Sequence, residues 1–122
     1  MIQTLPTYIE LSASLNSELI HETLVQTESD FGRFGISLDL ISTLPLQYDT
    51  VHQKLSNFLN AYMGADYPKL ISVLYQIDIS DKDINDCENA FPNYNYAQVL
   101  AHSILYREFK KIYFRRYYKN IE

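Results

Sequence analysis

Residues 48–62 read YDTVHQKLSNFLNAY, and this stretch decides the fold class because its apolar side chains recur every three or four positions. That interval matches the about 3.6 residues of an α-helical turn and gathers the apolar side chains on one face. We predict an amphipathic helix here that ends at Gly64. Its apolar positions are Tyr48, Val51, Leu55, Phe58, Leu59 and Tyr62.

The sequence before this segment predicts another helix. Apolar residues from Ser14 onward fall at helical spacing, and Gly32 and Gly35 break the pattern. The stretch that follows, up to Pro45, is expected to be a connector. Residues 1–13 show no sustained period, so we expect them to form an extended lead-in.

The sequence after Gly64 continues in helices. Asp66 can cap a new helix, and Pro68 fits its first turn. Residues 70–79 alternate like a strand and also form a helical stripe. We prefer a helix because the chain offers no convincing strand that could pair with this one.

Two further helices are expected near the C-terminus. Ser80 with Asp83 resembles a capping box and opens a short acidic helix that residues 91–93 end. The last helix runs over residues 94–118, and its first half is apolar on most sides and should be buried. In its second half the apolar residues point one way and the cations the other.

Together these elements predict an all-α fold. We expect a single domain over residues 1–122, a small bundle of four or five helices with a long C-terminal helix, because this length suits one core. The predicted core consists of Leu15, Leu19, Leu24, Val51, Leu55, Phe58, Leu59, Leu70, Leu74, Leu100, Ile104 and Leu105.

Two short motifs carry a resemblance to a known group. The stretches LYQIDISD (residues 74–81) and YREFKKI (residues 106–112) resemble the second half of small uncharacterised α-helical proteins of Bacteroidetes. The resemblance covers about a third of the chain. It implies a bacterial, all-helical protein and no particular activity.

Charge is distributed unevenly along the chain. Residues 107–122 hold six of the ten Lys and Arg and two acidic residues, a net charge of +4, whereas the rest of the chain carries −9. Cations near a helix C-terminus complement its partial negative charge, but six exceed what that effect requires. They can dock, within the chain or between copies, on acidic residues such as Asp78, Asp81, Asp83, Asp86 and Glu88.

The leading functional prediction is a non-enzymatic protein–protein interaction module or a small self-associating scaffold, including a homodimer. Tyr and Arg anchor interfaces well, so the C-terminal helix is the predicted partner-binding element. Nucleic-acid binding by cations and stacked aromatic rings is the alternative, and the acidic remainder of the chain argues against it. The predicted partner-binding residues are Tyr106, Arg107, Phe109, Lys111, Ile112, Tyr113, Arg115 and Tyr117.

A helical-bundle metalloprotein is a further alternative. His21 and His52 each follow a carboxylate by three positions, as in di-iron bundles where acid and imidazole share one helical face. However, His52 falls off its helix's apolar stripe, and Glu108 is the only acid on the interior stretch of the last helix. We therefore predict solvated histidines and neither a metal site nor a cofactor.

No catalytic residue is predicted, and we expect no enzyme. Cys87 lies among Asp83, Asp86 and Glu88, whose negative charges raise the pKa of a thiol and leave it unreactive. The sequence contains no nucleophile elbow, phosphate-binding Gly-rich loop or zinc-protease motif. It also lacks a long apolar run and a signal-like start, so we expect a cytoplasmic protein with no membrane span.

Overall fold

The computed structural model describes residues 17–44 and 46–121, with side chains for residues 18–44 and 46–115. The described part of the chain contains four helices and no strand. The helices are α2 (Ser17–Gly32), α3 (Tyr48–Ile77), α4 (Asp81–Ala90) and α5 (Tyr96–Ile121). The prediction of an all-α bundle with a long C-terminal helix is confirmed; the lead-in over residues 1–13 lies outside the described residues.

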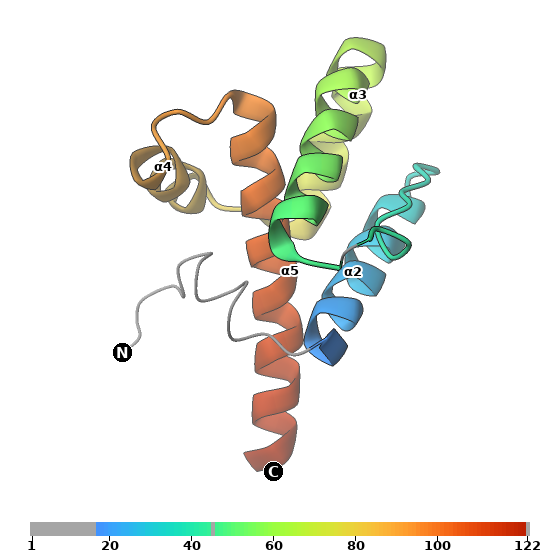
Figure 1. The fold of residues 1–122 in the computed structure, drawn as a ribbon, viewed down its shortest axis with the longest axis vertical. Coiled ribbons are helices and arrows are strands. Elements are labelled where there is room, and N and C mark those ends of the chain that lie inside the picture. Colours follow the sequence, from blue (N-terminus) through green and yellow to red (C-terminus); the bar gives the residue numbers. More distant parts are fainter. Residues whose placement is uncertain (1–16, 45, 122) are drawn as a thin grey trace.

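Helix α5 forms the axis of the bundle. Helices α2, α3 and α4 each pack against it, and α2 also contacts α3 (Figure 1). In Figure 1, α3 and α4 flank the first half of α5, while α2 lies against its middle. The second half of α5 therefore has α2 as its main neighbour.

Helix α3 consists of two segments that meet at Asp66. The backbone of Asp66 is not helical (φ −155°, ψ 73°), and its Oδ1 accepts a hydrogen bond from the Lys69 N–H at 3.2 Å. Pro68 has no N–H to donate to the preceding turn, which favours a break here. The second segment returns toward α5 instead of continuing the first (Figure 1). The break predicted after Gly64 and the cap at Asp66 are thus confirmed. The helix predicted for residues 70–79 is confirmed up to Ile77, where it ends because Asp78 adopts a left-handed conformation (φ 70°, ψ 53°).

The caps of the last two helices explain where each begins. The Asp83 N–H donates to Ser80 Oγ at 3.0 Å, as the sequence predicts. Helix α5 begins later than predicted, because Asn95 and Gln98 form a reciprocal capping box. The Gln98 N–H donates to Asn95 Oδ1 at 2.9 Å, and the Asn95 N–H donates to Gln98 Oε1 at 2.8 Å.

Most of the predicted core is buried. Leu19, Phe58 and Leu74 are only partly buried, and Leu15 lies outside the described residues. The fully buried members are Leu24, Val51, Leu55, Leu59, Leu70, Leu100, Ile104 and Leu105.

The connector between α2 and α3 contributes to the core, which the sequence analysis did not anticipate. Ile36, Leu38 and Leu40 are buried at alternate positions. The Glu28 carboxylate accepts the N–H groups of Leu40 and Ile41, at 2.8 and 3.0 Å, and so holds the connector against α2. This extended segment is therefore part of the hydrophobic core.

Candidate functional site

The predicted partner-binding residues of α5 divide between the interior and the surface. Tyr106, Phe109 and Ile112 are buried within this chain, and Phe109 belongs to its core cluster. Arg107 and Lys111 are partly exposed. Tyr113 and Arg115 are exposed, and the side chain of Tyr117 lies outside the described residues.

Arg107 of this set and the neighbouring Lys110 dock on acidic residues that the sequence analysis named. Arg107 NH2 lies 3.6 Å from Asp78 Oδ2, and its Nε donates to the Asp78 carbonyl at 3.2 Å. Lys110 Nζ lies 3.5 Å from Asp83 Oδ2 and 4.6 Å from the centre of the Tyr106 ring. The interpretation that these cations dock within the chain is confirmed for Arg107 and Lys110.

A third cation lies in the seam between α2 and α5. Lys111 Nζ is 3.4 Å from Asp30 Oδ2 and 3.2 Å from Glu108 Oε1. Gln26 donates to Asp30 Oδ1 at 3.0 Å and accepts from Arg115 at 3.3 Å. We call Asp30, Glu108 and Lys111 the seam triad: one ammonium group shared by two carboxyl groups.

The two carboxyl groups of the seam triad differ in acidity. Glu108 is 0% exposed, and burial, followed by its interaction with Asp30, raises its pKa to about 8. Burial alone would also raise the pKa of Asp30, but its hydrogen bond with Glu108 and the Lys111 charge outweigh that effect and lower it. At neutral pH, therefore, Glu108 keeps a proton and Asp30 is the partner that balances Lys111.

Histidines occupy a second cluster, and here a prediction is wrong. His52 and His102 are buried, whereas His21 is exposed as expected. His52 Nε2 donates to the Gln98 carbonyl at 2.9 Å, and its ring stacks between Tyr48 and Tyr94. Tyr48 from α3 and Tyr94 from the segment before α5 replace water around this ring, which the apolar stripe of α3 alone does not reveal.

His102 is held by the same cluster. Its Nδ1 is hydrogen-bonded to the Tyr48 hydroxyl, and its ring stacks on Tyr106 with the centroids 6.0 Å apart. Burial, followed by the proximity of His52, lowers its pKa to about 4. Burial also lowers the pKa of His52. Both rings are suited to packing as neutral groups.

Cys87 has the properties of a structural thiol. It is buried, and burial followed by the charge of Glu88 raises its pKa to about 11. Within residues 17–44 and 46–121 no group of three His, Cys, Asp or Glu side chains is arranged to hold a metal ion.

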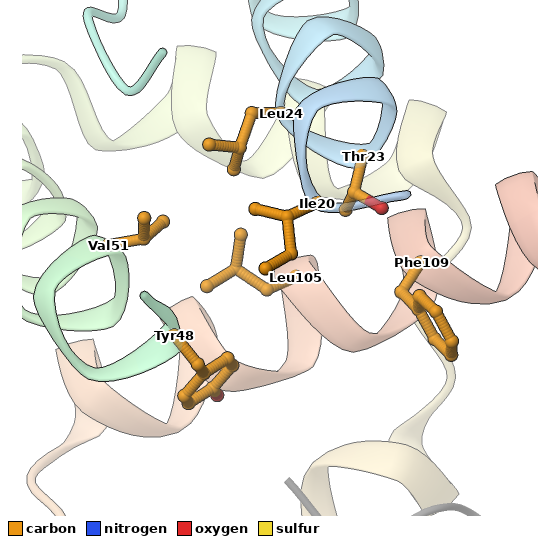
Figure 2. Close-up of a pocket in the computed structure, with 7 residues that line it drawn as sticks. All are labelled: Ile20, Thr23, Leu24, Tyr48, Val51, Leu105 and Phe109. Atoms are coloured by element: carbon orange, nitrogen blue, oxygen red, sulfur yellow. The ribbon is translucent and has the colours of Figure 1, made fainter. Parts of the chain in front are cut away.

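Hollows of two kinds adjoin the described helices, one apolar and one polar. Figure 2 shows an apolar pocket of about 30 Å³ where α2, α3 and α5 meet, with Ile20, Val51 and Leu105 pointing into it. This volume is about that of a single water molecule. A second, polar groove of about 350 Å³ lies between α3 and the start of α5, with Asp49 as its only charged lining residue.

The surface feature that the sequence analysis missed is an apolar stripe on the second segment of α3. Tyr67, Ile71 and Tyr75 are 42%, 43% and 88% exposed. They recur every four residues and therefore share one helical face, next to the buried stripe of Leu70 and Ile77. We call these three residues the α3 stripe. The sequence signal that could have revealed it is the width of the apolar face of this segment, which exceeds what one contact with the core can cover.

Tyr96, the first residue of α5, extends this surface. Its side chain is 46% exposed. The burial of the remaining part, followed by the proximity of Tyr67, raises the pKa of Tyr96. Tyr96 thus lies beside Tyr67 at one end of the α3 stripe.

Comparisons with known proteins add no family. No protein-family model matches the chain, and no similar curated protein or solved structure was found. None of the described helices is long and apolar enough to cross a membrane. Function is therefore inferred from the described residues.

Proposed function

We propose that this chain is a non-enzymatic protein–protein interaction module that acts in the cytoplasm. The observation that carries the proposal is the α3 stripe. Large apolar side chains that recur on one helical face, and that the core leaves exposed, are typical of a helix that packs on another protein.

The chemistry of the stripe defines its partner. Lys69 is the only charged residue between positions 67 and 77, so this part of the surface offers one cation and no carboxylate to a charged ligand. Tyrosine supplies a large apolar ring and a hydroxyl that can stay hydrated at the rim. The fitting partner is an apolar, uncharged helix face of a protein.

The interior supports a binding role over a catalytic one. Cys87 is buried with a raised pKa, and His102 is buried with a lowered pKa. Neither is poised for proton transfer or nucleophilic attack near neutral pH. The exposed members of the predicted α5 set, Tyr113 and Arg115, are a second contact area of the same module.

Site-specific photocrosslinking tests the proposal. A benzophenone amino acid replaces Tyr75 in cells that naturally produce the protein, and the matched control replaces Gln76, which is exposed on another face of the same helix. We expect an adduct with a polypeptide from position 75 and none from position 76. The absence of any adduct at position 75, or an adduct that joins position 75 only to residues of its own molecule, would refute the proposed function.

A further inference from the structure

The spacing of the α3 stripe is symmetric about its middle residue. Ile71 lies four positions after Tyr67 and four positions before Tyr75. When two such helices pack antiparallel around a two-fold axis, the middle residues meet each other and each outer residue meets the opposite outer residue. The stripe is thus complementary to a second copy of itself.

We infer that the partner on the α3 stripe is the same segment of a second copy of this chain, running antiparallel, with Ile71 at the two-fold axis. This inference rests on the proposed function and specifies its partner. In the pair, each Tyr67 packs against Tyr75 of the other copy.

The charge distribution supports pairing at this face. Each copy carries a net charge of −5, so most mutual approaches are repulsive. The segment over residues 67–77 has no carboxylate, and its one charge is Lys69. Two copies that meet along this segment therefore bring no carboxylate of residues 67–77 together, and Asp66 and Asp78 lie at its two ends.

The shape of this face also permits a close approach. Pro68 and Ser72 are small, exposed neighbours of the stripe, so little bulk keeps the second helix from the usual distance of about 8–10 Å between axes. Tyr96 adds contact area beside Tyr67. A single short helix buries less than the roughly 800 Å² per partner of a typical stable interface, so we expect a dissociation constant in the micromolar range or above.

Sedimentation equilibrium of the purified protein is the first experiment. We expect a monomer–dimer equilibrium that Tyr75→Glu weakens by about tenfold or more, because the variant places a carboxylate in an apolar contact. Gln76→Glu adds the same charge to the same helix outside the stripe and should leave the equilibrium unchanged. Tyr75 is 88% exposed, so its replacement does not disturb the core.

Disulfide trapping decides the orientation. Cys87 is buried and its pKa is raised to about 11, so a new surface thiol is the reactive one. Tyr67→Cys and Tyr75→Cys variants are mixed and oxidised with oxidised glutathione. We expect a disulfide-linked mixed dimer joined between positions 67 and 75, whereas each variant alone forms no disulfide-linked dimer, because an antiparallel pair brings only unlike positions within disulfide reach.

The outcomes separate this inference from the function on which it rests. Disulfides between like positions, a purely monomeric protein, or a dimer insensitive to Tyr75→Glu would each overturn the antiparallel self-pair. In those cases an adduct at position 75 with a different polypeptide still supports an interaction module. Failure of the crosslink as well would remove both.

Discussion

The seam triad and the α3 stripe place charge and apolar surface opposite to the simplest expectation. In the seam, Asp30, Glu108 and Lys111 bring ionisable groups into the interface of α2 and α5. On α3, Tyr67 and Tyr75 remain at the surface. If the proposed function holds, stability and association depend on separate parts of this molecule: ionisable groups lie in the internal packing of α2 and α5, and apolar side chains of α3 are exposed.

Among changes within the seam triad and the α3 stripe, the largest expected effect comes from removing the cation of the seam triad. Lys111→Met leaves Asp30 with no ammonium partner in a buried position, and breaking a buried pair is strongly destabilising. Because Lys111 is 23% exposed, we expect the free energy of unfolding to fall by about 2–3 kcal/mol, less than for a fully enclosed pair. Urea unfolding followed by circular dichroism measures this loss.

A surface pair supplies the control for that experiment. Lys82 Nζ lies 2.7 Å from Asp86 Oδ2 in α4, and both side chains are well exposed. Lys82→Met should leave the urea midpoint unchanged, because water screens such pairs. Equal losses for Lys111→Met and Lys82→Met would show that the seam triad contributes no more than a surface contact.

The pH dependence of stability gives the next largest effect. The folded pKa of Glu108 is raised from 4.5 to about 8, so its contribution to stability is complete below pH 4.5 and is lost as the pH rises toward 8. The lowered pKa of His102, about 4, acts in the opposite direction between pH 4 and 6.5. A fall in wild-type stability is therefore clearest between about pH 6.5 and 8.

Glu108→Gln isolates this contribution because Gln cannot ionise. We expect the variant to be more stable than wild type by about 2 kcal/mol at alkaline pH and to lose the decline above pH 6.5. Urea unfolding at closely spaced pH values makes the comparison. Parallel curves for the two proteins would contradict a proton held by Glu108 in the seam.

These two regions also show what a sequence can and cannot reveal. Helix positions follow from local periodicity and caps, as at Asp66 and Ser80, because both depend on neighbours within one or two turns. The sequence places Glu108 on the interior stretch of the last helix, but it does not show which groups surround this carboxyl group, because Asp30 is remote in the chain. The contact between Glu108 and Asp30 depends on how α2 packs on α5, which local spacing does not describe.

The same reasoning explains the remaining differences. His52 falls off the apolar stripe of α3, yet Tyr94 from the segment before α5 covers its ring. The alternation of Ile36, Leu38 and Leu40 was visible in the sequence, but without a strand to pair with it did not predict that these side chains belong to the core. For the candidate site, the spacing of Tyr67, Ile71 and Tyr75 was visible, whereas their exposure depended on how much of α3 the core covers.

The smallest expected effect completes the comparison. Tyr75→Gln in dilute, monomeric protein should change the free energy of unfolding by less than about 0.5 kcal/mol, because substitutions at exposed positions rarely do more. Leu70→Ala, in the same segment but fully buried, should lower it by about 2–5 kcal/mol. Thermal and urea unfolding at low protein concentration distinguish the two. A large loss for Tyr75→Gln would mean that the α3 stripe stabilises the monomer itself. Contact with a partner would then be the wrong explanation for the large apolar side chains that recur every four residues on that face.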